Sequence, residues 1–75
     1  MSREDYDHLA AEQNHVCAIC HGTGARRLAV DHDHATGKVR GLLCSNCNAG
    51  IGLLNEDIDR VLTVIQYLLH GGSTA

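Results

Sequence analysis

The chain has 75 residues with four cysteines, two tyrosines and no tryptophan, phenylalanine or proline, so it can build only one small core. A domain of this size buries only roughly 60 % of its unfolded surface and usually needs a staple to be stable. No apolar run reaches a membrane-spanning length, and Arg3, Glu4 and Asp5 stand where a signal peptide has its basic and apolar regions. We therefore expect a cytoplasmic protein whose thiols stay reduced and bind metal.

The formal net charge of −3 does not by itself indicate a protein that binds nucleic acid. The charge is uneven, however, and the centre of the chain is basic. Residues 21–43 carry two more basic than acidic side chains, with Arg26, Arg27, Lys38 and Arg40 against Asp31 and Asp33. A bound divalent cation would further neutralise the two central carboxylates.

The N-terminal half predicts a helix, a cysteine-bearing turn and a hairpin. Ser2 as N-cap and an acidic first turn begin a helix of about three turns, which should end near Asn14. Its inner face would hold Tyr6, Leu9, Ala10 and Gln13. Residues 17–24 then form a tight turn, and residues 28–31 and 39–43 are typical of short strands joined by a loop over 34–38.

The C-terminal half predicts two helices. Residues 48–54 favour a short helix weakened by its two glycines, and Asn55 or Asp57 caps a longer helix that ends at the glycines 71–72. We expect the apolar stripe of this longer helix to lie in the core, with a homodimer interface as the alternative. The stripe consists of Ile58, Val61, Leu62, Ile65, Leu68 and Leu69. Residues 73–75 should form a frayed tail.

Two cysteine pairs, each with two residues between its members, predict a structural zinc site. Four thiolates at this spacing suit tetrahedral zinc and leave no open position for a water molecule. The predicted ligands are Cys17, Cys20, Cys44 and Cys47. Two free thiol pairs or a redox motif are the alternatives, and a redox motif needs a thioredoxin-like setting that 75 residues cannot supply.

A run of four titratable side chains, residues 31–34, follows the first predicted strand. Strand alternation sends Asp31 and Asp33 to one face and the two histidines to the other, but a bend would let Asp31 and His32 border one site. A neutral imidazole can accept a proton near physiological pH, and a carboxylate suits a hard cation such as Mg²⁺. A solvated polar loop or a second zinc site remains an alternative on the pattern alone.

Residues 30–48, Val-Asp-His-Asp-His-Ala-Thr-Gly-Lys-Val-Arg-Gly-Leu-Leu-Cys-Ser-Asn-Cys-Asn, resemble the core of the phage recombination endonuclease VII family. That family belongs to the HNH, or ββα-metal, nucleases. With the first cysteine pair and the last helix, the resemblance extends from about residue 6 to residue 69. It implies a small α+β zinc-stapled domain over residues 1–75, with a ββα-metal (His-Me finger) core and flanking helices. The implied activity is metal-dependent cleavage of DNA by a phage or prophage protein.

The resemblance also implies a role for each matching residue. Asp31 and Asn48 would bind the catalytic Mg²⁺ or Mn²⁺, and the four cysteines would bind the structural Zn²⁺. His32 would be the general base, and His34 would contact the scissile phosphate or assist the base. We add Lys38 and Arg40 as phosphate contacts. These roles fit hydrolysis of a phosphodiester, which needs an activated water and a cation at the departing 3′ oxygen.

The expected partner is DNA, read through its phosphates and therefore without sequence specificity. We expect a monomer or a homodimer and no membrane contact. The chain departs from the resemblance at Ile51, where the junction-resolving relative carries an acid, and in lacking that relative's further dimerisation helices, so nicking or general cleavage is expected rather than junction resolution. The rival hypothesis is a noncatalytic four-cysteine zinc module that binds nucleic acid or protein. Asp31, His32 and Asn48 favour the nuclease, because a binding module needs no base beside a hard-metal site.

Overall fold

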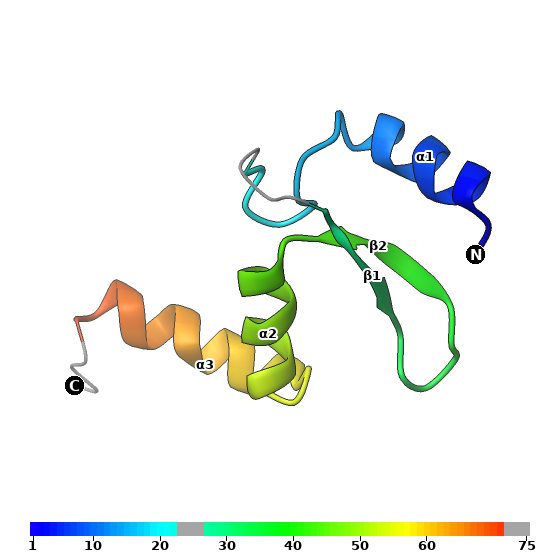
Figure 1. Cartoon of the computed structure of the whole chain (residues 1–75). Helices are drawn as coiled ribbons and strands as arrows, with labels where there is room; N and C mark the ends of the chain where they lie inside the picture. Colours follow the sequence, from blue (N-terminus) through cyan, green and yellow to red (C-terminus); the bar gives the residue numbers. More distant parts are fainter. Residues whose placement is uncertain (23–26, 72–75) are drawn as a thin grey trace.

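Three helices and one antiparallel hairpin make up the part of this computed structural model that is described, residues 1–22 and 27–71 (Figure 1). The elements are α1 (Arg3–Glu12), β1 (Ala29–His32), β2 (Val39–Leu43), α2 (Ser45–Leu53) and α3 (Ile58–Leu69). The small α+β class expected from the sequence is confirmed. Arg26, the second glycine of the pair 71–72 and the predicted tail over 73–75 lie outside the described residues.

The first helix begins as the sequence predicts. The Ser2 hydroxyl accepts a hydrogen bond from the Asp5 backbone N–H at 3.0 Å, and the Asp5 carboxylate accepts one from the Ser2 N–H at 3.4 Å. This reciprocal capping box satisfies two of the N–H groups that a helix start leaves unpaired. Farther along α1, the Tyr6 hydroxyl donates to the Leu28 carbonyl at 2.7 Å, which ties the helix to the segment entering β1.

Gln13, the C-cap of α1, joins this helix to the second strand. Its amide nitrogen donates to the carbonyls of Val16 and Leu42 at 2.9 and 3.0 Å, and its amide oxygen accepts from the Leu42 N–H at 2.9 Å. Glycine at position 41 leaves room for this approach, because a β-carbon on Gly41 would lie 3.2 Å from the Gln13 oxygen and push it back. Gly41 and Leu42 of β2 therefore contact the Gln13 side chain at the end of α1.

We predict that Gln13→Ala lowers the free energy of unfolding by about 1–3 kcal/mol, because it removes the partner of the N–H of the fully buried Leu42, whereas the Leu42 carbonyl still accepts from the Ala18 N–H. Denaturant unfolding of the zinc-loaded protein measures this change. Gln66→Ala is the matched control, since the Gln66 side chain pairs with His70 on an exposed helix face, and it should change stability by less than about 0.5 kcal/mol. Equal effects of the two substitutions would contradict the role given to Gln13.

The hairpin carries an irregularity beside the acid and histidine run. Asp31 lies opposite Gly41, but His32 lies opposite Val39, so Arg40 is an extra residue on β2. Such a bulge bends the strand and re-aims the side chains around it. The loop is closed by Asp33, whose carboxylate accepts from the Ala35 N–H at 2.8 Å. The glycine at position 37 adopts a φ of 77°, which other residues rarely reach.

α2 begins at Ser45, three residues earlier than predicted, because the second cysteine pair is part of the helix. Cys44 is its N-cap, and the Cys44 sulfur accepts a hydrogen bond from the Cys47 N–H at 3.4 Å. Figure 1 shows the hairpin between α1 and α2. The core lies at this junction and consists of Ala10, Cys17, Leu28, Leu42 and Leu43, with Tyr6, Leu9, Val30, Cys44, Cys47 and Ile51 packed around it.

The prediction that the stripe of α3 lies in the core is wrong. Asp57 caps the helix as expected, and the amphipathic pattern forms, but Ile58, Leu62, Leu68 and Leu69 are exposed. The turn after α2 directs α3 away from the hairpin (Figure 1), so its apolar side chains do not reach the core among the described residues. The radius of gyration of 14.5 Å accordingly exceeds the roughly 11 Å of a compact chain of this length.

Candidate functional site

The four cysteines form one cluster, as the sequence predicts. Cys17 and Cys20 come from the turn before β1, and Cys44 and Cys47 come from the junction of β2 and α2. Their four sulfurs all lie within 4.8 Å of one another, and the sulfurs of Cys20 and Cys44 are 3.8 Å apart. Zn–S bonds of about 2.3 Å in a tetrahedron place sulfurs about 3.8 Å apart, so the cluster fits a zinc ion with little adjustment.

Backbone hydrogen bonds prepare these sulfurs for a metal. The N–H groups of Ile19 and Gly22 donate to the sulfurs of Cys17 and Cys20, each at 3.4 Å. Burial opposes ionisation of Cys17, but hydrogen bonds from the backbone of Cys20, Cys44 and Ile19 outweigh it and lower the pKa of its thiol to about 6. Ionised sulfur is the form that binds zinc.

Four neighbouring thiolates repel one another unless a cation lies between them. The hydrogen bond with the Cys44 side chain, together with burial and the nearby sulfurs of Cys20 and Cys17, raises the pKa of the Cys47 thiol to about 12. A divalent cation reverses this effect, because its charge favours ionisation of every thiol that binds it. The donor set therefore fits a four-sulfur zinc site that ties the start of the hairpin to α2.

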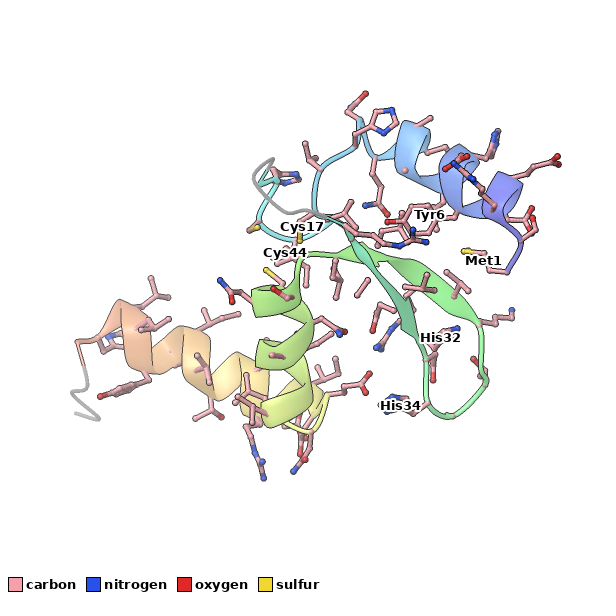
Figure 2. The ribbon with its side chains drawn as sticks, in the orientation of Figure 1. Met1, Tyr6, Cys17, His32, His34 and Cys44 are labelled. Atoms are coloured by element: carbon pink, nitrogen blue, oxygen red, sulfur yellow. The ribbon has the colours of Figure 1, made fainter. Side chains whose placement is uncertain are left out.

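The acid and histidine run lies at the other end of the hairpin. Figure 2 shows His32 and His34 near the loop that joins the strands, away from Cys17 and Cys44. His32 ends β1 and is exposed, whereas the neighbouring Asp31 is half-buried. The zinc cluster and this run thus occupy opposite ends of one hairpin, so the structural and the candidate catalytic groups are separate.

Asp31 is bound by the extra residue of β2. The Arg40 guanidinium donates to both Asp31 oxygens, from Nε at 2.7 Å and from a terminal nitrogen at 3.0 Å. This two-point geometry matches the fork of a guanidinium to a carboxylate. The bulge places Arg40 for this contact, and the contact with Asp31, followed by one with Glu56, raises the pKa of Arg40 further above its ordinary value. The Asp31 carboxylate is therefore already paired with the positive charge of Arg40.

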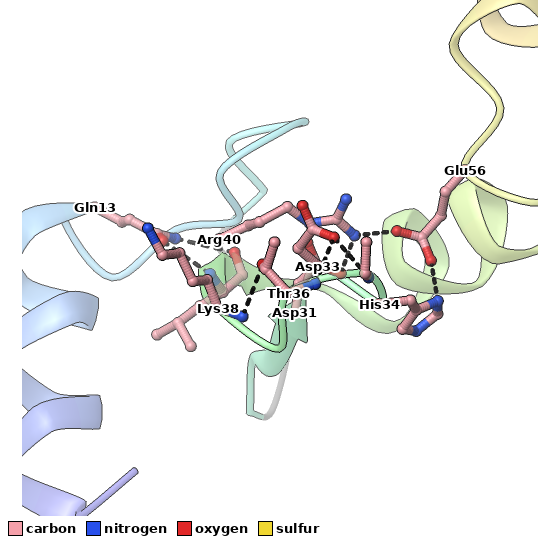
Figure 3. A network of polar contacts seen from close by, with 10 residues as sticks. Gln13, Asp31, Asp33, His34, Thr36, Lys38, Arg40 and Glu56 are labelled. Carbon is pink, nitrogen blue, oxygen red and sulfur yellow. Dashed lines mark hydrogen bonds and ion pairs between the residues drawn. The ribbon is translucent and has the colours of Figure 1, made fainter.

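Glu56 extends the network from the α2–α3 turn. One of its carboxylate oxygens accepts from Arg40, and the other forms an ion pair with His34, 2.6 Å from its Nδ1 (Figure 3). The Glu56 side chain is only 18 % exposed, although it belongs to a turn. The network thus joins Asp31, Arg40, Glu56 and His34 from three parts of the chain, and three of these four are among the predicted site residues.

Sequence reasoning missed Glu56. It stands among several acids of the C-terminal half, and nothing in its local pattern separates it from Asp57 or Asp59, which belong to the start of α3. No sequence motif relates Glu56 to the hairpin residues that it contacts. The one signal in the sequence is the position of Glu56 between two helices, directly after the Asn55 of a tight turn, and that signal does not give the direction of the side chain.

Comparison with known proteins identifies the family. The family model for recombination endonuclease VII matches residues 1–70. The chain belongs to the recombination endonuclease VII family. It is 40 % identical over 70 residues to the gene 59 protein of Mycobacterium phage L5 and 41 % identical over 71 residues to the gene 59 protein of Mycobacterium phage D29. These matches cover 89 % and 91 % of this chain but 43 % of each relative, so the chain spans less than half their length. No solved structure shows a significant match.

Membership of the endonuclease VII family confirms the resemblance drawn from residues 30–48. Ile51, the position at which that resemblance places an acid, packs against the core instead. Glu56 is a half-buried acid beside the hairpin loop, and its N–H donates to the Ile51 carbonyl at 2.9 Å. None of the helices described has the length and apolar character needed to cross a membrane.

The remaining predicted residues of this endonuclease VII family member lie around the network without joining it. Asn48 is exposed on α2, which packs against both strands, and its N–H donates to the Cys44 carbonyl at 3.0 Å. Lys38 is exposed in the loop, where its N–H donates to the Thr36 hydroxyl at 3.2 Å. Arg27 stacks over the Tyr6 ring, 4.5 Å from its centre, and so belongs to the α1 side of the hairpin.

Proposed function

We propose that this chain is a metal-dependent DNA endonuclease domain of the HNH (ββα-metal) type, spanning residues 1–75. Family membership supports a nuclease, and the order hairpin, cysteine pair, helix supports the ββα subclass. The observation that carries the proposal is the packing of α2, which bears Asn48, against the hairpin that bears Asp31 and His32, with the cysteine cluster at their junction. The activity of the full-length relatives is outside this inference, because the chain covers 43 % of them.

In the proposed site, Asp31 and Asn48 supply carboxylate and amide oxygens, the donors that Mg²⁺ and Mn²⁺ prefer. Such an ion would supply positive charge to the departing 3′ oxygen of the phosphodiester. His32, exposed at the end of β1, would take the proton of the attacking water, and His34 would hold the scissile phosphate. Arg40 donates to both Asp31 oxygens, so a metal ion at Asp31 would take the place of the guanidinium.

The proposed substrate is DNA bound through its phosphates, with Lys38 and Arg40 as contacts, and therefore without sequence specificity. A monomer or a homodimer remains the prediction. The exposed apolar face of α3 favours the homodimer, since contiguous apolar surface marks an interaction site. The rival function is a noncatalytic zinc module that binds nucleic acid or protein. The ion pair of Asp31 and Arg40 favours that rival, because the Asp31 carboxylate already binds the guanidinium where the nuclease needs it to bind a metal ion.

The direct test is a nicking assay on supercoiled plasmid, with linear and branched DNA in parallel. We expect nicks in Mg²⁺ or Mn²⁺, and none in excess EDTA, when the protein has been loaded with zinc beforehand. The EDTA samples need a check of circular dichroism after the reaction, which separates loss of the catalytic ion from loss of the zinc. A folded, zinc-loaded protein that binds DNA but cuts none of the three substrates in either metal would establish the rival function.

A further inference from the structure

Glu56 occupies a place that no sequence motif assigns and that the proposed chemistry has not used. It is the carboxylate that contacts both a predicted phosphate-binding histidine and a predicted phosphate-binding arginine. We propose that Glu56 is a positioning residue of the active site, which holds His34 and Arg40 so that their free nitrogens face the phosphate. This inference rests on the proposed nuclease function and adds the α2–α3 turn to its site.

The contact with His34 determines which ring nitrogen is left for the substrate. An ionised carboxylate has no proton to donate, so an ion pair at 2.6 Å is favourable when Nδ1 of His34 carries the proton. The other nitrogen, Nε2, is then free, and the His34 side chain is 84 % exposed. A histidine fixed through one nitrogen by a carboxylate has a set orientation at the other, as in the pairs that orient metal-binding histidines.

The contact with Arg40 gives that residue a second anchor. Arg40 donates to Asp31 through two nitrogens and to Glu56 through one. If a cation or a phosphate draws Asp31 away from the guanidinium, Glu56 still holds Arg40 beside the hairpin. Because a guanidinium carries five N–H donors in a rigid plane, the donors that Glu56 does not use remain for a phosphate.

The backbone conformation at position 56 is unfavourable for any residue with a side chain. Asn55 and Glu56 have φ values of 57° and 55°, a region that glycine and asparagine adopt easily and glutamate does not. Asn14 and His15 follow α1 in the same conformation, so the backbone alone assigns no role. It does supply a sharp test, because glycine at position 56 suits the turn better than glutamate and so removes the whole side chain without adding strain to the backbone.

The first experiment compares Glu56→Gly and Glu56→Gln in the zinc-loaded chain. We expect both to retain fold and zinc content and to lower kcat for plasmid nicking by roughly 10- to 100-fold, with a smaller change in KM, as is typical of lost orienting partners. Glu12→Gln is the matched control, since Glu12 also faces a histidine, His8 at 3.4 Å, but on exposed α1. Wild-type kcat in Glu56→Gly would mean that Glu56 serves only the turn and would overturn the proposal.

The second experiment needs no activity. Nitrogen chemical shifts of the His34 ring in the zinc-loaded protein without Mg²⁺ report which nitrogen carries the proton. We expect a proton fixed on Nδ1 in the wild type and an exchange between both nitrogens in Glu56→Gly. Identical His34 spectra in the two proteins would overturn the proposal whether or not the chain cuts DNA. A changed spectrum in a chain that never cuts would refute the nuclease function and leave the contact established.

Discussion

Removal of the zinc ion proposed for the four-cysteine cluster should unfold this domain completely. Zinc bound to four cysteines contributes on the order of 10–16 kcal/mol at neutral pH, which equals or exceeds the total stability of an ordinary small domain. Among the described residues the hydrophobic core has five buried members, and one of them is the predicted zinc ligand Cys17, so the core contributes little stability without the metal. Far-ultraviolet circular dichroism during titration with a zinc chelator should show loss of helix in step with zinc release.

Cys44→Ala tests the same prediction without a chelator. It removes one sulfur from the cluster and also the N-cap of α2, so the variant should be largely unfolded at room temperature even in added zinc. Asn48→Ala is the comparison, because Asn48 lies one turn later on the exposed face of α2. It should keep the spectrum of the wild type and lose cleavage. Equal loss of structure in both variants would make Asn48 a folding residue rather than a metal ligand.

His32→Ala should abolish nicking while the fold is kept. Loss of a general base costs typically 10²- to 10⁴-fold in rate, and His32 is exposed at the end of β1, so its removal leaves no cavity. Time courses of supercoiled plasmid in Mn²⁺ measure the rate, and zinc content and thermal unfolding measure the fold. The rate should fall by at least 10²-fold, with both fold measurements unchanged.

His15→Ala is the matched control for this substitution. His15 is also an exposed histidine, but it lies in the turn after α1 and outside the hairpin loop. It should nick at the wild-type rate. A His32→Ala variant that nicks as fast as the wild type would show that another group takes the proton of the water, and His34 would then be the first residue to test.

Local patterns alone were enough to predict most of the elements. The Ser2 cap with its acidic first turn, the Asp57 cap and the β-branched strands around a glycine-containing loop depend on contacts within a few residues, and the structure confirms each. The cysteine cluster was also predictable, because two sulfurs separated by two residues can face one ion from a single turn. α2 differed at its start because a cysteine acts as its N-cap, a role more often taken by serine or aspartate.

The positions of α3 and Glu56 could not be predicted in the same way. An amphipathic stripe shows that a helix has an apolar face, but not which surface that face meets, and here the turn after α2 carries it away from the core. The bulge at Arg40 likewise depends on the pairing of two strands, which no single strand specifies.

The sequence by itself determined the class of domain, the cysteine cluster and the family, because these follow from short-range spacing and from a specific run of residues. Only the tertiary structure decided that Asp31 is bound by Arg40, that Glu56 reaches the hairpin loop and that α3 is exposed. The physical reason is that these features arise from contacts between residues 9 to 22 positions apart, whose geometry is set by a bulge and by a strained turn.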